Sequence, residues 1–388
     1  MLTPFKSAVF ASLLLHLAAP VRLNGSEGIL SHPLEVPILY DGSTLRIPVR
    51  MFGKTLYFIV DTGSTISGVD IRYVSDLGKP LENVQASTMS VSGPQLTIYP
   101  CPDCYLEDIP VGIDKIAAMN LSGINTISGS PCDGVLGMDF LRQHAFSINL
   151  DKKTLTIADS AAEDVRDGAV TIPLSLIRGQ HFAVQARVNQ VPVQFMIDTG
   201  DSGSMSLNAA DWKRVFPSGS AKVHTILEGG VSSEPVRISA ARVDSMELAS
   251  NHYQNLVATL ANNPAAPSTL GLKFLRRHIV TFDFVDQTLF LRPSLLFTEL
   301  ESADMSGLHI IRQGQDTVIY AVDEGSPAAQ VKLAAGDVIE SINGKEARSL
   351  TLRDIRRALK SRDQERVTIG IRRGDGEDTY QFVLKSSL

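Results

Sequence analysis

The sequence predicts a mainly β protein in which two duplicated β lobes precede a smaller α+β domain. A hydrophobic strand that leads into Asp-Thr-Gly occurs at residues 58–64 and again at residues 195–201, 137 positions later. A hydrophobic pair and a glycine, followed by Phe-Leu-Arg, occur at residues 135–142 and again at residues 269–276. Self-similarity at a fixed spacing is the sequence signature of a repeated structural unit. After residue 305 a different pattern begins.

Each repeat is predicted to open with a β-hairpin that leads into the Asp-Thr-Gly turn. Alternating apolar residues at 45–51 and 182–188 precede the two turns, and short connections follow at 52–54 and 189–190. Alternation with a period of two, interrupted by turn residues, is typical of paired strands. The alternative is one large β domain with a chance tripeptide repeat, but two ordered landmarks in each copy argue against it.

A second strand pair is predicted to close each repeat. It follows His144 in the first copy, at residues 145–157, and His278 in the second, at residues 279–291. Polar turn residues interrupt both runs, as expected for hairpins. We therefore expect a first lobe over residues 34–160, a second lobe over residues 165–295 and a C-terminal domain over residues 300–388.

Length and composition fit a soluble globular protein. The chain has 388 residues, which suits two or three domains. It is 44% hydrophobic and 20% charged, an ordinary balance. The formal net charge is -6 and no long basic run occurs, which argues against nucleic acid as a partner. Beyond the N-terminus no stretch reaches the roughly 18 apolar residues of a membrane helix, so no membrane span is expected in the mature chain.

Residues 1–25 are predicted to be a signal peptide. Lys6 supplies a positive charge, residues 7–19 are mostly apolar, and small residues near Ala19 and Gly25 suit a cleavage site. The alternative is a buried N-terminal helix. Export predicts a periplasmic or extracellular location, without distinguishing between the two.

Three cysteines, Cys101, Cys104 and Cys132, are disulfide candidates in an exported protein. The first two form a C-x-x-C, which also suits a redox or half-zinc motif. No second C-x-x-C or nearby histidine pair completes a zinc site. Pro100 and Pro102 predict an irregular loop where a redox motif usually opens a helix. We expect one structural disulfide with one thiol left over, and the pairing stays open.

The two Asp-Thr-Gly turns predict acid–base chemistry by Asp61 and Asp198. Glycine lets two such turns approach closely, and the threonine hydroxyls can bond across to the partner turn. Two carboxyl groups facing each other on a local two-fold axis cannot both be ionised, so they share one proton. Such a pair can activate a water molecule for attack on a peptide carbonyl without a metal or other cofactor.

With these residues the chain resembles the retropepsin/pepsin-like aspartic proteases, in particular the exported bacterial type with two lobes and a PDZ domain. The resemblance rests on residues 61–64 with 135–137 and on residues 198–200 with 269–271. It implies a bilobal acid-protease fold and a substrate cleft covered by hairpin flaps, for which spacing suggests residues 85–100 and 222–238. The supporting residues that it implies are Thr62, Gly63, Ser64, Thr199 and Gly200.

Asp201 departs from this pattern, because it occupies the position of Ser64. The Ser64 hydroxyl can donate a hydrogen bond to the outer oxygen of Asp61, whereas an ionised carboxylate cannot donate. We expect Asp201 to be protonated, turned to solvent, or a third negative charge that raises the proton affinity of the pair. In the last case Asp201→Ser lowers the upper limb of the pH–activity profile. The departure also leaves open that the site is inactive.

Residues 200–203, Gly-Asp-Ser-Gly, suit the nucleophile loop of a trypsin-like serine protease. Ser202 would then need a histidine base and an orienting acid. The upstream histidines, His32, His144 and His181, have no recognisable local context for that role. The serine hypothesis also leaves the first Asp-Thr-Gly unexplained.

The chain after residue 305 resembles the circularly permuted PDZ domains of bacteria. Gly-Ser-Pro-Ala at residues 325–328, and the segment 336–344 with Gly-Asp-Val-Ile and Ile-Asn-Gly, carry this resemblance. It implies that an extended peptide adds to an edge strand while backbone N–H groups hold its terminal carboxylate. The peptide-binding residues that it implies are Gly307, Leu308, His309 and Ile310.

The groove helix of this domain is expected at residues 352–360, after a capping-box-like start at Thr351 and Asp354. One helical face then carries Leu352, Ile355 and Leu359, which suits either the groove or plain core packing. His309 could equally line the pocket or lie in solvent.

The leading functional interpretation is an aspartic endopeptidase in which the PDZ-like domain docks peptides or regulates activity. The alternative is a non-catalytic peptide-binding or quality-control protein with an inactive cleft. Retention of both Asp-Thr-Gly turns favours the enzyme. The implied partners are a peptide or unfolded protein substrate and a peptide C-terminus at the PDZ groove. One chain supplies both halves of the site, which predicts a monomer with a pseudo-two-fold centre.

Overall fold

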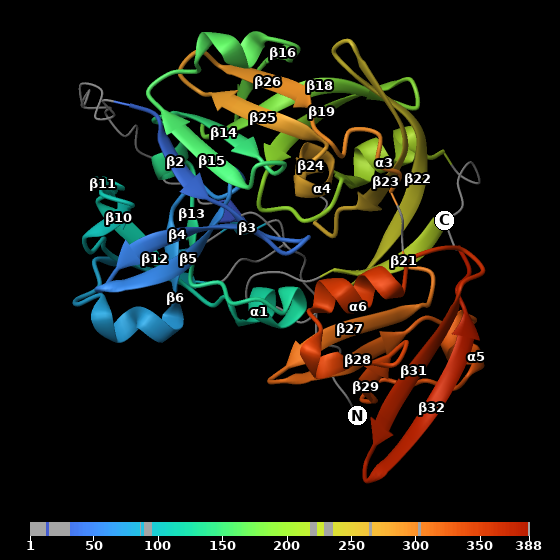
Figure 1. Cartoon of the computed structure of the whole chain (residues 1–388). Helices are drawn as coiled ribbons and strands as arrows, with labels where there is room; N and C mark the ends of the chain where they lie inside the picture. Colours follow the sequence, from blue (N-terminus) through green and yellow to red (C-terminus); the bar gives the residue numbers. More distant parts are fainter. Residues whose placement is uncertain are drawn as a thin grey trace.

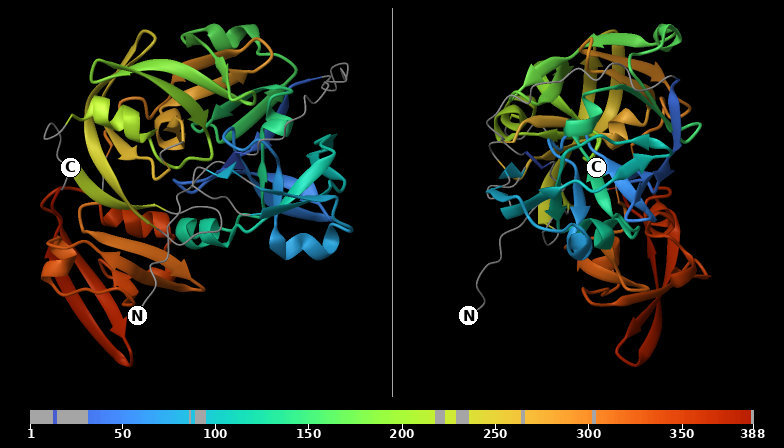
Figure 2. Two further views of the ribbon diagram at one scale, coloured as in Figure 1. Left: turned by 180° about the vertical axis from the view of Figure 1, so that it is seen from behind. Right: turned by 90° about the vertical axis from the view of Figure 1, so that its left-hand side faces the viewer.

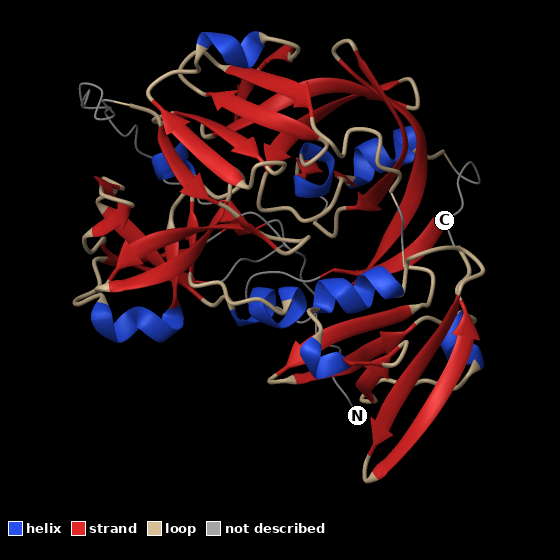
Figure 3. Ribbon diagram, in the orientation of Figure 1, coloured by secondary structure: helices blue, strands red, loops and turns tan. Residues whose placement is uncertain are grey.

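A computed structural model describes the chain over residues 13–14, 32–85, 87–88, 95–217, 223–228, 236–263, 266–301 and 304–386. The predicted signal peptide, apart from the strand β1 (Leu13–Leu14), lies outside these ranges, as do parts of both predicted flap segments. β1 pairs with β8 (Ser87–Thr88). Figures 1 and 3 show two strand-rich lobes and a separate C-terminal domain, so the predicted mainly β fold class is confirmed.

The first lobe is built on one sheet with the strand order β11-β10-β4-β5-β13-β6-β12-β9-β7, and β3 pairs with β4 at its side. Its strands are β3 (Leu39–Tyr40), β4 (Leu45–Met51), β5 (Lys54–Val60), β6 (Gly68–Asp70), β7 (Glu82–Gln85), β9 (Gln95–Pro100), β10 (Cys104–Leu106), β11 (Ile109–Pro110), β12 (Lys115–Met119) and β13 (Gly134–Leu136). Its helices are η1 (Ile71–Asp76), α1 (Ser122–Ser128) and α2 (Met138–Leu141).

The second lobe repeats this plan with the order β17-β18-β19-β24-β20-β23-β22-β21. Its strands are β17 (Ser175–Ile177), β18 (His181–Val188), β19 (Val191–Asp198), β20 (Met205–Leu207), β21 (Val223–Glu228), β22 (Val236–Leu248), β23 (Asn251–Leu260) and β24 (Ser268–Gly271). Its helices are α3 (Ala209–Val215) and α4 (Leu272–Leu275). In both lobes the strand before the Asp-Thr-Gly turn pairs in parallel with the strand of the second landmark, β5 with β13 and β19 with β24. The duplication read from the sequence is therefore present in the topology.

A third sheet joins the two lobes in the order β16-β26-β25-β14-β15-β2. Its strands are β2 (Leu34–Pro37), β14 (Ala145–Asn149), β15 (Thr154–Ala158), β16 (Val170–Pro173), β25 (His278–Asp283) and β26 (Thr288–Pro293), and the short helix η2 (Glu163–Arg166) precedes β16. Phe146 of the first lobe lies opposite Phe282 of the second, with stacked rings 4.7 Å apart. Burying these apolar faces in one sheet fixes the two repeats relative to each other.

The C-terminal domain has its own buried apolar core. Figure 2 shows this domain as a unit set apart from the two lobes. Its sheet has the order β27-β28-β29-β31-β32, with β30 paired to β29. Its elements are β27 (Leu308–Gln313), β28 (Asp316–Val322), α5 (Pro327–Gln330), β29 (Val338–Ile342), β30 (Lys345–Glu346), η3 (Ala347–Ser349), α6 (Leu352–Ala358), β31 (Arg366–Arg373) and β32 (Gly376–Val383). Helix α6 begins with the predicted capping box of Thr351 and Asp354. The residues of its predicted apolar face, Leu352, Ile355 and Leu359, are part of the buried core.

Candidate active site

Asp61 lies directly after β5, in the first Asp-Thr-Gly turn, and is buried. The amides of Gly63 and Ser64 donate to its Oδ1 at 2.8 and 3.1 Å. Because the turn aims two consecutive N–H groups at one carboxylate oxygen, the backbone fixes the orientation of this side chain. The Ser64 hydroxyl, expected to donate to Asp61, instead donates to the carbonyl of Ile66 at 2.8 Å. That expectation was wrong: the backbone amide of Ser64, and not its hydroxyl, donates to Asp61.

Asp198, the last residue of β19, is held in the same way in the second lobe. The amides of Gly200 and Asp201 donate to its Oδ1 at 2.9 and 3.1 Å. The two turns are therefore copies of each other in geometry as well as in sequence.

The threonines of the two turns bond across the lobe boundary. The Thr62 hydroxyl donates to the carbonyl of Ile197 at 2.8 Å, and the Thr199 hydroxyl donates to the carbonyl of Val60 at 2.7 Å. Each hydroxyl also accepts the backbone N–H of the other threonine at 3.0 Å. Four reciprocal hydrogen bonds in a buried site lock the two turns together.

Glycine is required where the two turns meet. A Cβ atom added to Gly200 would overlap the carboxyl group of Asp61. The carboxyl of one lobe therefore packs directly on the backbone of the other lobe's turn. The two Asp-Thr-Gly turns are far apart in the chain, and the structure brings them into contact as the sequence predicted.

Asp61 holds a proton at mildly acidic pH. Burial raises the pKa of Asp61 to about 6, against the opposing effects of the Gly63 amide and of a hydrogen bond with the Asp198 side chain. The negative charge of Asp201 makes a smaller contribution to this raised value. A buried carboxyl that shares a hydrogen bond with a second carboxyl titrates as part of a pair.

Asp201 is buried and not turned to solvent, which removes one of the three expectations for it. Its Oδ2 accepts the hydroxyl of Thr269 at 2.7 Å, and its Oδ1 accepts the amide of Gly203 at 2.7 Å. Burial raises the pKa of Asp201. The sequence reasoning did not predict a role for Thr269. The signal that could have indicated one is that both Thr269 and Asp201 differ from their counterparts in the first repeat, Val135 and Ser64.

His181 is a second contributor that sequence reasoning did not place in this site. It opens β18, is buried, and lies 3.0 Å from the carbonyl of Gly63 through its Nε2. His144, another candidate base of the serine hypothesis, packs its ring on Phe140 with centroids 4.9 Å apart. Neither of these two contacts involves Ser202.

The residues expected to bind a peptide carboxylate in the C-terminal domain have an internal partner. Gly307, with a φ of 76°, turns the chain into β27. Its amide and that of Ser306 donate to Asp304 Oδ1 at 2.7 and 2.8 Å. The amide of Leu308 donates to the Ser306 hydroxyl at 3.0 Å. Part of the loop is therefore already satisfied by a carboxylate of the chain itself.

The strand and helix that flank the expected groove contact the first lobe. Arg356 of α6 donates to the carbonyl of Ile310 in β27 at 2.9 Å and to that of Ile127 in α1 at 2.7 Å. A Cβ atom added to Gly129, just after α1, would lie 2.8 Å from Leu352. Figure 1 shows α1 beside α6 and β27. His309 does not lie free in solvent, since its Nε2 lies 2.9 Å from Asp323.

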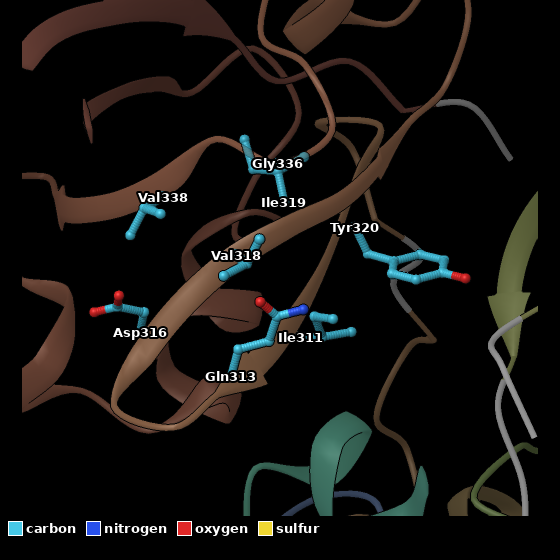
Figure 4. Close-up of a pocket in the computed structure, with 8 residues that line it drawn as sticks. All are labelled: Ile311, Gln313, Asp316, Val318, Ile319, Tyr320, Gly336 and Val338. Atoms are coloured by element: carbon cyan, nitrogen blue, oxygen red, sulfur yellow. The ribbon is translucent and has the colours of Figure 1, made fainter. Parts of the chain in front are cut away.

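Two pockets lie away from the two aspartates. One, of about 320 Å³, is formed by β27, β28 and the start of β29, with Asp316 and Tyr320 among its lining residues (Figure 4). Another, of about 260 Å³, lies between the β4–β5 turn and the loop before β10.

Within the described ranges no group of three or more His, Cys, Asp or Glu side chains is placed to hold a metal ion. In the same part of the chain no helix is long and apolar enough to cross a membrane.

All three cysteines are free thiols, which contradicts the expected disulfide in this state of the protein. The sulfur atoms of Cys101 and Cys104 lie 3.7 Å apart, in contact but not bonded. Their hydrogen bond lowers the pKa of Cys104 and raises that of Cys101. Cys132 is buried, with its thiol directed to the carbonyl of Gly134, and burial raises its pKa to about 12. Among the three cysteines, the sulfur atoms in contact are thus those of the C-x-x-C pair, Cys101 and Cys104.

Two β lobes with the same strand plan thus meet at two Asp-Thr-Gly turns that are hydrogen-bonded to each other. Residues 184–277 match the family model described as "gag-polyprotein putative aspartyl protease". Residues 318–373 match the PDZ domain model, so the expected C-terminal PDZ domain is confirmed.

Among solved structures the chain is similar to a retropepsin-like aspartic protease from Rickettsia conorii. The two share 22% identity over 32% of this chain and 88% of that one, with a TM-score of 0.25. No curated protein sequence matches the chain.

Proposed function

We propose that this protein is an aspartic endopeptidase with Asp61 and Asp198 as its catalytic pair. The observation that carries the proposal is the geometry of the two turns: each buried aspartate is held by two amides of its own turn, and the threonine hydroxyls bond the turns to each other. The raised pKa of Asp61 supplies the acid of the pair, and Asp198 supplies the base.

In this mechanism a water molecule lies between the two carboxyl groups and beside the scissile peptide carbonyl. Asp198 takes a proton from the water while the water oxygen bonds to the carbonyl carbon. Asp61 gives its proton to the carbonyl oxygen. The tetrahedral diol then collapses. Asp198 gives its proton to the amide nitrogen, the C–N bond breaks, and one diol hydroxyl gives its proton to Asp61 as the new carboxylic acid forms, which restores the single proton of the pair. The amides of Gly63 and Gly200 keep both carboxyl groups in place throughout.

The first experiment compares cleavage of an unfolded protein at pH 4–7 by wild type, Asp61→Asn, Asp198→Asn and Ser202→Ala. We expect each Asp→Asn change to reduce kcat by about 10³-fold or more, because the pair loses either its acid or its base. Ser202→Ala and wild type should cleave alike, and an aspartic-protease transition-state inhibitor should block both. Loss of activity in Ser202→Ala alone would instead establish the serine hypothesis.

The alternative proposal is a non-catalytic peptide-binding protein that retains the cleft. The observation that favours it is the buried Asp201, an additional carboxyl beside the pair that could hold too many protons in the site. Wild-type protein that binds an unfolded chain but leaves it intact between pH 3 and pH 8 would establish this alternative.

For the PDZ domain we propose regulation in preference to simple docking. Support comes from the contacts of Arg356 with both β27 and α1, and from the place of Asp304 in the loop before β27. A peptide end that adds to β27 must displace both, so binding there would loosen the domain from the first lobe. We also propose export, which rests on the pattern of residues 1–25 alone.

A further inference from the structure

Glu301 lies between the second lobe and the PDZ domain, and it is only 5% exposed. Its carboxylate accepts hydrogen bonds from the hydroxyl of Ser204 and, at 2.9 Å, from the amide of Val257. Two cations face it, with nitrogen–oxygen distances of 3.4 Å to Arg277 and 3.7 Å to Lys273. A residue outside both β repeats thus connects four groups of the second lobe.

The repeat explains why a carboxylate is needed at this place. Ser204 follows Asp198 by six residues, as Ser67 follows Asp61 in the first lobe. The hydroxyl and amide of Ser67 donate to Asp139 of its own lobe at 2.7 and 2.8 Å. The second lobe has Lys273 at the position of Asp139, so its own sequence supplies a cation where the first lobe has an acceptor.

We propose that Glu301 is a positioning residue of the second catalytic turn, replacing from outside the lobe the carboxylate that Asp139 supplies within the first. Its acceptor oxygen fixes Ser204 at the end of the loop that begins with Asp198. The carbonyl of Ser204 in turn accepts the amide of Gly271 at 3.0 Å, which ties this loop to β24. The inference rests on the proposed function, because it assigns a role toward a catalytic Asp198.

A purely structural role for Glu301 makes a different prediction. If it only neutralises Lys273 and Arg277, its loss lowers stability without a selective effect on the Asp198 turn. If it positions that turn, an aspartate placed at residue 273 should take over the hydrogen bond to Ser204, as Asp139 serves Ser67. This reciprocal change is available because the two lobes are copies.

The experiment uses the full chain as wild type, Glu301→Gln, Lys273→Asp/Glu301→Gln and the control Glu299→Gln. Glu299 is two residues away, and its carboxylate pairs with Arg276 at the surface. Activity is measured as kcat and KM separately, across pH, with Asp198→Asn in the same assay. Hydrogen exchange of residues 198–204 and 61–67 is measured in parallel, as a readout that does not depend on activity.

We expect Glu301→Gln to lower kcat about 10- to 100-fold with KM changed less than about threefold, since misplacement of a catalytic group affects the transition state. Amides of residues 198–204 should exchange about tenfold faster or more, while those of residues 61–67 stay unchanged. The double variant should recover most of both losses, and Glu299→Gln should match wild type.

Equal kcat and equal exchange in Glu301→Gln and Glu299→Gln would overturn the inference. If Glu301→Gln does not fold, the double variant decides: recovered activity supports positioning, whereas an inactive or unfolded double variant contradicts it. If wild type cleaves nothing, the proposed function fails by itself. Exchange at residues 198–204 then still tests whether Glu301 holds this turn.

Discussion

At the residue scale the chemistry depends on buried carboxyl groups whose surroundings differ between the lobes. Asp61 and Asp139 each have a pKa raised to about 6 by burial, and burial also raises the pKa of Asp201. Hydrogen-bond donors face all three, but in none do they outweigh desolvation. The centre of the molecule is therefore sensitive to pH in the mildly acidic range.

Asp201→Asn tests the charge beside the pair. The amide oxygen can accept the hydrogen bond from Gly203, and the Thr269 hydroxyl can rotate to accept one from the new NH2 group. The change removes the negative charge that raises the pKa of Asp61. The limb of the kcat/KM profile set by Asp61 should move to lower pH, by on the order of half a unit. Asp108→Asn, at a fully exposed side chain, should leave the profile unchanged. If this limb of the kcat/KM profile stays at the same pH in Asp201→Asn, the charge of Asp201 does not affect the pKa of Asp61.

Asp139→Asn tests the link between burial and stability. The folded-state pKa of Asp139, about 6, is above its ordinary value of 3.8, so its contribution to stability is fully present below pH 3.8. That contribution is lost as pH rises through 6, and amounts to about 3 kcal/mol. The free energy of unfolding, measured by urea titration at pH 4 and pH 7, should therefore fall less with rising pH in Asp139→Asn than in wild type. An identical pH dependence would contradict the assignment.

At the element scale two short turns do what neither lobe can do alone. Each turn follows a buried strand and orients one aspartate, while the cross-bonded threonines hold the two ends together. The interlobe sheet, with Phe146 stacked on Phe282, provides a second attachment between the lobes. The pair of aspartates thus depends on elements from both repeats.

Thr199→Val tests the cross-lobe lock. The change removes the hydrogen bonds of its hydroxyl to the carbonyl of Val60 and to the amide of Thr62, leaving both groups buried and unbonded. We expect the free energy of unfolding to fall by about 2–5 kcal/mol, with a loss of activity. Thr55→Val, on the exposed face of β5, is the matched control and should change stability by less than about 0.5 kcal/mol. Equal stabilities of the two variants would show that the lock is dispensable.

At the scale of the whole molecule the PDZ domain is attached to both lobes. Arg356 and Arg353 donate to backbone carbonyls of the first lobe, at Ile127 and Tyr40. Arg237 of the second lobe donates to the carbonyl of Val322 in β28 at 3.3 Å. We therefore expect peptide binding at the PDZ groove to be coupled to the contacts of this domain with the two lobes.

Arg356→Met tests this coupling, because methionine keeps the unbranched aliphatic stem of the side chain but removes the two hydrogen bonds of the guanidinium group. We expect the affinity of the full chain for a peptide with a free apolar C-terminus to rise about tenfold, since a larger fraction of molecules then has an open β27 edge. Isothermal titration calorimetry measures the change. Arg357→Met, at an exposed side chain on the same helix, serves as control. Equal affinities in both variants would exclude a groove closed by α1.

The sequence by itself determined the duplication, the two Asp-Thr-Gly turns and the PDZ domain, because each depends on a local pattern repeated at a readable spacing. It also indicated that Asp201 is exceptional. It did not show that Asp201 is buried against Thr269, or that the Ser64 hydroxyl turns away from Asp61. Side-chain rotation and burial are set by neighbours that the motif does not contain.

Only the tertiary structure decided which distant groups meet. Glu301 reaches Ser204 across 97 positions, and Arg356 reaches Ile127 across 229. No local period encodes such contacts, because they arise from how separately folded units pack against one another. The physical division is therefore between turns and strands, which neighbouring residues specify, and the contacts between lobes and domain, which depend on the assembled fold.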